Sequence, residues 1–236
     1  MLARAGRWTG GRSRCISPSM ILTPIAPHCL PNLLQRCEAA LSGPARAVFR
    51  RLAQPAEAER ARDHAARAHH AQALALLTTL GMGVRCGNPR EDFSWNGTTV
   101  RSDTEAYVLL HEAAHFQLAA PARRHAIDFG LGPGPETGAR DRAERAAMLF
   151  GLAREREEAM ASLLGILWEV ELGQPALASF LDQNWLEGAP RQTALRHFSA
   201  TLATLHADGF LTADGRPTQR LRATPDDQDS ALRGPA

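Results

Sequence analysis

The sequence predicts a mainly α-helical protein of the α+β class, with a single domain spanning residues 31–222. Apolar residues recur at three- and four-residue spacing along most of this region, which is the pattern of amphipathic helices. The one stretch that favours β-strands is short and lies between residues 84 and 101. The chain has 236 residues, of which 44% are hydrophobic and 22% charged. One globular domain accounts for this length and composition.

Residues 1–30 and 223–236 are expected to lie outside this domain. The first stretch mixes arginine with glycine and proline and has no acidic side chain. We expect it to be a disordered extension, or the product of a start codon assigned too early. It also lacks the continuous apolar segment of a secretory signal. The polar stretch after Arg222 is expected to form a flexible tail.

The composition excludes several functional classes. All 27 basic residues are arginine, which excludes a lysine Schiff base and a lysine-bearing phosphate loop. The net charge is only +2 and is spread along the chain, which argues against direct nucleic-acid binding. No apolar run approaches the ~18 residues of a membrane span, so we expect no membrane association. The four cysteines form no Cys-x-x-Cys pair, which favours free thiols in a cytoplasmic protein.

The first half of the domain is predicted to contain two helices and a β-hairpin. One helix begins at Pro31 and is interrupted by Ser42-Gly43-Pro44; the next follows Pro55, a suitable first-turn residue, and runs to about Leu80. Two short β-favouring runs then flank Asn96-Gly97, the dipeptide most typical of a tight hairpin turn.

Four helices are predicted after the hairpin. Ser102 and Glu105 have the spacing of a capping box and open a helix that should end near Ala119, before Pro121. The remaining helices follow from apolar spacing and from glycine and proline breakers: residues 141–172, with Gly151 and Gly165 as expected bends and Gly173 as the stop, a short helix after Pro175, and residues 191–207.

The capped helix contains the sequence His111-Glu112-Ala113-Ala114-His115. Histidines four residues apart lie one turn apart on the same helix face, so both imidazoles can bind one metal ion. Glu112 points about 100° away around the helix axis, where a carboxylate can act as a base towards metal-bound water. The surrounding residues are apolar, and burying these polar groups without a partner would cost several kcal/mol.

Two histidines leave a divalent ion without enough ligands, so a third protein ligand is expected. The acidic run at residues 155–158 lies in the next long helix, which one loop can bring alongside the first. Glu158 directly precedes an apolar stretch and is the preferred ligand, with Glu155, on the same face, as the reserve. The sequence thus predicts a zincin-like pair of helices around a metal.

The region 105–222 resembles the elongation factor P hydroxylases. The most specific shared feature is the pattern Ala-Arg-Arg-x-x-x-Asp-Phe-Gly at residues 122–130, which follows the His-Glu-x-x-His motif. Other matching features are Glu-x-x-Glu at Glu155 and Glu158, Gly-x-Pro at 173–175, a stretch at 184–188 and the turn at 207–210. The resemblance implies a cytosolic non-haem iron protein that uses dioxygen to hydroxylate a modified lysine of elongation factor P, its protein partner. It also implies that His111, His115 and Glu158 hold Fe(II), a ligand set that leaves positions open for dioxygen and substrate.

Three residues of the shared pattern have two interpretations. Arg124 and Asp128 are one turn apart if a helix resumes after Pro121, and they would then form an ion pair. Alternatively Arg123, Arg124 and Asp128 line the rim of the metal pocket or bind the substrate.

Two other functions fit the motif. In a zinc metallopeptidase, Glu112 would deprotonate a zinc-bound water and Glu158 would complete the zinc site. In a catalytically inactive helical binding module, no stoichiometric metal would be present. The resemblance favours the hydroxylase.

Overall fold

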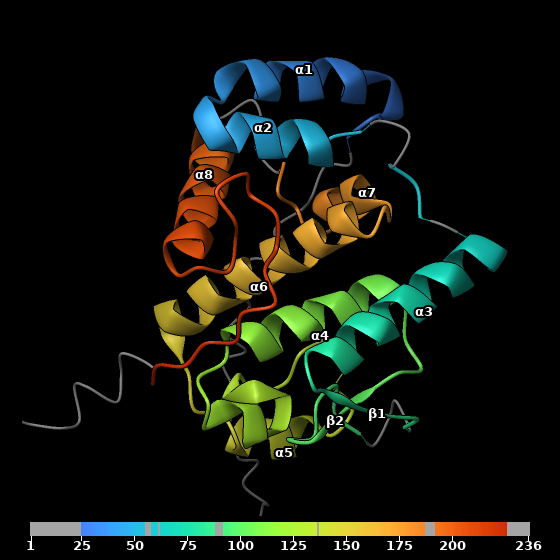
Figure 1. The fold of residues 1–236 in the computed structure, drawn as a ribbon, viewed down its shortest axis with the longest axis vertical. Coiled ribbons are helices and arrows are strands. Elements are labelled where there is room, and N and C mark those ends of the chain that lie inside the picture. Colours follow the sequence, from blue (N-terminus) through green and yellow to red (C-terminus); the bar gives the residue numbers. More distant parts are fainter. Residues whose placement is uncertain are drawn as a thin grey trace, which may run out of the picture.

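Helices α4 (Ala106–Leu118) and α6 (Gly151–Glu171) lie side by side at the centre of the molecule, and the other elements pack around them (Figure 1). The structure is a computed structural model that describes residues 25–54, 58–60, 62–87, 92–135, 137–186 and 192–225. Most of the expected N-terminal extension and C-terminal tail lies outside these residues. Within them the prediction of a mainly helical protein is confirmed.

Small residues allow α4 and α6 to approach each other closely. Ala114 of α4 and Ala161 of α6 are fully buried. A Cβ atom on Gly165 would lie only 3.1 Å from Cα of His111 and 3.3 Å from the carbonyl oxygen of Leu110. The missing side chain at Gly165 therefore sets the spacing of the two helices directly beside His111.

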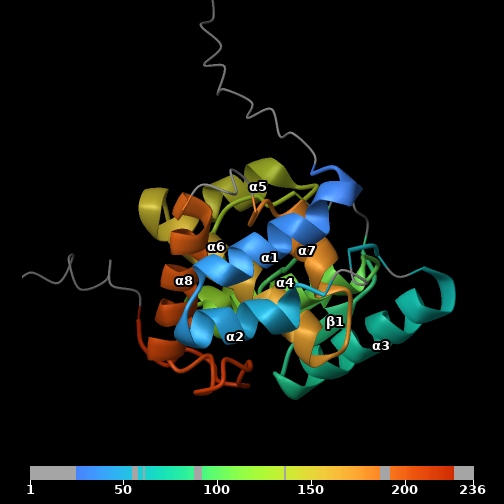
Figure 2. The same ribbon diagram turned by 90° about the horizontal axis from the view of Figure 1, so that it is seen from above.

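The remaining helices enclose this pair. Helix α3 (Asp63–Thr79) packs along α4, whereas α7 (Ala176–Asp182) and α8 (Gln192–Ala207) pack against α6. Figure 2 shows α1 (Leu30–Ala40), which follows a 3₁₀ turn at Pro27–Cys29, and α2 (Gly43–Leu52) lying over one end of this assembly. Edge-to-face ring contacts with centroids 5.8–6.1 Å apart join Phe49, Phe180 and Phe198 of α2, α7 and α8. Among the described helices, none combines the length and apolar character needed to cross a membrane.

Two predictions for the first half of the domain are wrong. The Ser42-Gly43-Pro44 sequence does not only end α1; Pro44 lies in the first turn of a second helix, α2, which was not predicted. The helix predicted to follow Pro55 begins only at Asp63. Before it, Arg60 donates hydrogen bonds to Ser179 (2.6 Å) and Asp182 (2.8 Å), which ties this segment to α7.

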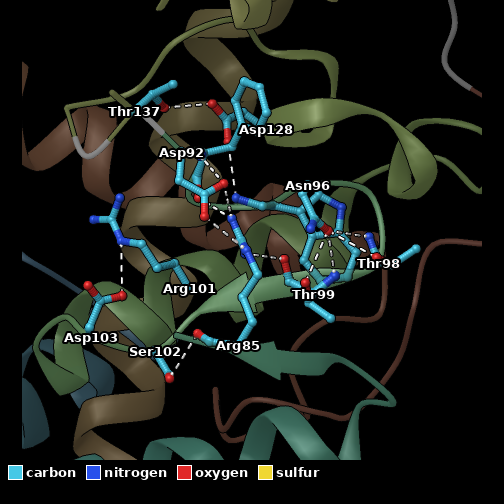
Figure 3. Close-up of polar contacts among 12 residues, drawn as sticks. Arg85, Asp92, Asn96, Thr98, Thr99, Arg101, Ser102, Asp103, Asp128 and Thr137 are labelled. Carbon is cyan, nitrogen blue, oxygen red and sulfur yellow. Dashed lines mark hydrogen bonds and ion pairs between the residues drawn. The ribbon is translucent and has the colours of Figure 1, made fainter. Parts of the chain in front are cut away.

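The predicted hairpin is replaced by a parallel pair of three-residue strands. Strand β1 (Gly83–Arg85) pairs with β2 (Thr99–Arg101) in parallel. Asn96-Gly97 does turn the chain, but the turn leads only to one isolated antiparallel bridge, between Trp95 and Val100. The Arg85 side chain accounts for the difference, because it donates to Asp92, to the Phe93 carbonyl and to the Thr99 carbonyl, and so holds β1 beside the turn (Figure 3).

The predicted capping box at Ser102 and Glu105 does not form. The Ser102 hydroxyl donates to the Arg85 carbonyl (3.0 Å), because the backbone of Ser102 is still paired with β1. Helix α4 begins at Ala106 with Glu105 as its N-cap residue and without a side-chain cap. Its end at Leu118 agrees with the prediction.

The long helix predicted for residues 141–172 is two helices, α5 (Arg140–Arg145) and α6. The chain between them leaves the helical path because the amides of Met148 and Leu149 both donate to the Gly130 carbonyl. Gly151 has a φ of +55° at the start of α6, so it separates the helices rather than bending one. The predicted stop at Gly173, the short helix α7 and the last helix α8 are all present.

A buried glutamine fastens the C-terminal segment to the central helices. The side chain of Gln117 is fully buried and accepts a hydrogen bond from the Trp168 indole (2.8 Å). Its amide donates to the carbonyls of Thr218 (2.7 Å) and Arg220 (3.0 Å). The backbone carbonyl of Gln117 accepts a hydrogen bond from the backbone amide of Arg222 (2.8 Å).

Replacing Gln117 with leucine should lower the free energy of unfolding by about 2 kcal/mol or more, because the buried Trp168 indole and the carbonyls of Thr218 and Arg220 lose their hydrogen bonds at once. Urea denaturation followed by circular dichroism measures the change. Gln219→Leu, an exposed glutamine in the same segment, is the matched control and should leave the stability nearly unchanged. Equal effects of the two substitutions would contradict the anchoring role.

Candidate metal centre

The structure brings together the three side chains that the sequence predicted as metal ligands. The Nε2 atoms of His111 and His115 lie 3.0 Å apart on α4. Oε2 of Glu158, on α6, lies 3.4 Å from Nε2 of His115 and 3.9 Å from Nε2 of His111. Glu155, the reserve ligand, is exposed and is not part of this group.

This spacing suits one transition-metal ion. One potential ligand atom from each of the three residues lies within 4.8 Å of the other two. Two ligands that each bind a metal at ~2.1 Å and at right angles are about 3 Å apart, close to the separation of the two imidazole nitrogens. Two imidazoles and a carboxylate are the donors that iron, zinc and related divalent metals accept in proteins.

Burial and mutual charge prepare these groups for metal binding. Burial, followed by the neighbouring His115, lowers the pKa of His111 to about 3, so its imidazole is neutral near pH 7. Burial acts to raise the pKa of Glu158, but the hydrogen bond from His115 and nearby positive charges outweigh it and lower that pKa to about 2. For His115 burial also opposes the charged form, yet Glu158 and the neighbouring glutamates raise its pKa above the usual value. A divalent cation would take the place of the proton that His115 shares with Glu158.

Aromatic stacking holds the ring of His115. Phe129 stacks on His115 with centroids 5.7 Å apart, and Trp95 stacks on Phe129 with centroids 5.3 Å apart. Within the part of the chain that the structure describes, the buried Nδ1 of His115 has no hydrogen-bond partner. The orientation of this ring therefore depends on packing rather than on a hydrogen bond at Nδ1.

The backbone that carries Phe129 is strained. Asp128 and Phe129 have φ angles of +43° and +53°, a left-handed conformation that costs of order 1–3 kcal/mol per non-glycine residue. The carboxylate of Asp128 accepts hydrogen bonds from the Trp95 amide (3.1 Å) and the Thr137 hydroxyl (2.6 Å; Figure 3), and its own amide donates to the Trp95 carbonyl (2.9 Å). These bonds offset the strain and keep Phe129 against His115.

The expected ion pair between Arg124 and Asp128 does not form. The chain after Pro121 folds into two 3₁₀ turns, Arg123–His125 and Ile127–Gly130, separated by an extended Ala126, so the two residues do not share a helix face. Arg124 instead donates to the carbonyls of Phe116 and Arg222.

Arg123 and Arg124 have internal partners and do not line the metal pocket. Arg123 is almost fully buried, forms two hydrogen bonds with the carboxylate of Glu157 and donates a third to the Phe129 carbonyl (2.8 Å). It thereby joins the segment behind His115 to the residue next to Glu158. Of the three residues weighed for substrate contact, only Asp128 lines the pocket.

The candidate ligands face an open cavity of about 820 Å³. Glu112, the predicted catalytic residue, is mostly buried and lines this cavity. Further walls come from residues that the sequence analysis did not select: Arg60, Tyr107, Asp182, Trp185 and His197. Tyr107 precedes His111 by one helical turn, so helix periodicity alone could have identified it.

Arg60 closes one side of the cavity. Its guanidinium lies 3.6 Å from the centroid of the Tyr107 ring and is hydrogen-bonded to Ser179 and Asp182. No local pattern in the sequence signals this role, because the residues that Arg60 contacts come from α4 and α7.

The depressed pKa of His111 predicts how the stability of the metal-free protein depends on pH. As the pH falls below 6.5, His111 takes up a proton in the unfolded chain but not in the folded protein, so its contribution to stability decreases until the pH reaches about 3. Most carboxylates remain ionised between pH 6.5 and about 5. In this range His111→Gln should remove part of the fall in the free energy of unfolding, at most ~1.4 kcal/mol per pH unit. Urea denaturation in the presence of a chelator measures this pH dependence, and identical pH slopes for both proteins would refute a neutral His111 in the folded protein.

None of the protein-family models, curated proteins or solved structures compared with this chain matches it. The functional proposal therefore depends on the geometry of the candidate metal centre and on the sequence pattern at residues 122–130.

Proposed function

We propose that the protein is a non-haem, iron-dependent hydroxylase that acts on a protein side chain, as the elongation factor P hydroxylases do. The observation that carries this proposal is the meeting of His111, His115 and Glu158 at one point in an open cavity. Two imidazoles and one carboxylate occupy one side of a metal and leave its other positions free. Fe(II) bound there would supply the redox chemistry that activates dioxygen. A zincin-like pairing of α4 and α6 around the ion is part of this proposal.

The position of the shared sequence pattern supports the hydroxylase over other metal enzymes. Residues 122–130 lie directly behind the metal centre, where Phe129 stacks on His115 and Arg123 binds the neighbour of Glu158. Two residues of the pattern therefore contact the two helices that carry the candidate ligands.

The cavity suits a long side chain that bears an amine, such as the modified lysine of elongation factor P. Its volume lies in the range of small-molecule sites, and the carboxylates of Glu112 and Asp128 line it. A carboxylate is the natural partner of an ammonium group, and Glu112 can also accept a proton near the metal. Burial raises the pKa of Asp128, which lets this carboxyl group exchange a proton at higher pH than usual. We place the reaction in the cytoplasm, where a translation factor is found.

A zinc metallopeptidase is the second candidate. The observation that favours it is the position of Glu112, which lines the same cavity as the candidate ligands, as the base of a metallopeptidase would. Against it, the strands of the described residues are only three residues long, which offers little edge for an extended peptide.

Metal analysis of protein purified without oxygen tests the centre itself. We expect near-stoichiometric iron in the wild type and loss of metal in His115→Ala, because two remaining ligands bind a divalent ion far more weakly. His206→Ala, an exposed histidine on α8, is the matched control and should keep its metal. Tight zinc together with peptide cleavage that Glu112→Gln abolishes would establish the peptidase. Wild-type protein without metal, and with unchanged stability in chelator, would leave only a binding module.

Activity on the proposed substrate gives a second test. Elongation factor P incubated with the iron-loaded protein, dioxygen and a reductant should gain the mass of one oxygen atom, seen by intact-mass spectrometry. The His115→Ala protein should produce no such gain, because the iron ligand is missing. Equal gains with both proteins would show that the oxidation does not depend on this centre.

A further inference from the structure

A second cavity, of about 450 Å³, lies on a different face of α6 from the metal centre. It is bounded by the first turns of α6, the end of α8 and the C-terminal segment that Gln117 anchors (Figure 1). Glu157 lines this cavity, whereas its neighbour Glu158 lines the metal cavity. The two cavities are therefore separate sites.

Positive charge exceeds negative charge around this second cavity. Three arginines line it: Arg156, Arg220 and Arg222. Among the described residues, the lining carboxylates are Glu157, which is already bound to Arg123, and Asp208, which lies 3.6 Å from Arg222. The carboxylates within the cavity thus leave most of the arginine charge uncompensated.

One of these arginines has an unused donor. Among the described residues, the buried Nε of Arg222 has no hydrogen-bond partner, although buried donors in proteins are almost always paired. The neighbouring Arg124 donates to the Arg222 carbonyl, and burial together with the charge of Arg222 lowers the pKa of Arg124. The positive charges of Arg124 and Arg222 therefore lie close together beside an unpaired donor. A bound anion would reduce their repulsion and accept hydrogen bonds from them.

We propose that this cavity binds a phosphate group carried by a small molecule. A planar guanidinium group can donate two parallel hydrogen bonds to phosphate oxygens. Three arginines around one cavity offer more donors than a single carboxylate can accept. Leu149, Met160 and Phe210 line other parts of the cavity and suit an apolar portion of the same ligand. Its volume falls in the range of small-molecule pockets.

Isothermal titration of the full chain with inorganic phosphate and with phenyl phosphate, at constant ionic strength, tests the proposal. We expect saturable binding of both, with phenyl phosphate the tighter because its ring contacts the apolar wall. Sodium acetate should bind more weakly than either. Arg220→Gln should weaken phosphate binding at least about tenfold, which corresponds to about 1.4 kcal/mol. Arg156→Gln should also weaken phosphate binding. This substitution lies on α6 and leaves the backbone contacts of Arg222 in place.

Two control variants decide where the anion binds. Arg145→Gln, an exposed arginine on α5 outside the cavity, should bind phosphate as the wild type does. His115→Ala should also retain binding, because the metal centre is a separate site. Loss of binding in His115→Ala would place the anion at the metal centre and overturn the proposal. Equal weakening by Arg145→Gln and Arg220→Gln would indicate only general attraction to positive charge and would also overturn it.

The sequence offers one internal competitor, the aspartates at positions 226, 227 and 229, which follow the last residues lining the cavity. Changing all three to asparagine in the full chain should leave the phosphate affinity nearly unchanged. If phosphate binds only after this change, the arginines serve the chain's own tail rather than an external ligand, and the proposal is wrong.

Discussion

The close contact of α4 and α6 at Gly165 is the constraint on which the rest of the structure depends. The candidate ligands lie on both helices, and the atoms that would bind a metal must stay within a few ångströms of one another. A Cβ at Gly165 would press on the backbone of His111, so any larger residue would move one histidine relative to Glu158. The helix packing that forms the core and the geometry that forms the candidate metal centre are thus the same contact.

The buried ion pair of Arg123 and Glu157 transmits this constraint to the segment behind His115. Removing one partner of such a pair leaves an uncompensated buried charge and costs roughly 3–5 kcal/mol. Because Arg123 also binds the Phe129 carbonyl, the position of Phe129 is tied to α6 as well as to α4. The strained backbone at Asp128 and Phe129 is held between these two helices, which explains how an unfavourable conformation persists there.

Residues whose role depends on local periodicity could be predicted from the sequence, and residues whose role depends on distant partners could not. His111 and His115 share a helix face by spacing alone, and Glu158 could be chosen because an apolar stretch follows it. The parallel strand pair depends on the contacts of Arg85 with Asp92 and Thr99, which no alternation of residue types encodes. The prediction of one continuous helix across Met148 is wrong for a similar reason. The Met148 amide donates to the carbonyl of Gly130, which belongs to another segment. Arg123 was predicted to contact substrate or line the rim of the pocket, but its partner Glu157, far along the chain, holds it inside the protein.

The adjacent residues Glu157 and Glu158 line two different cavities from one turn of α6. Successive residues of a helix point about 100° apart, so a single segment of α6 presents one carboxylate to the metal cavity and the next to the arginine-lined cavity. Arg123 neutralises Glu157, and this leaves the nearby arginines without that carboxylate as a partner. The same ion pair that steadies the helix beside Glu158 therefore also creates the excess positive charge of the second cavity. The stability of the candidate metal centre and the anion affinity of the arginine-lined cavity would then share one cause, the burial of Arg123 against α6.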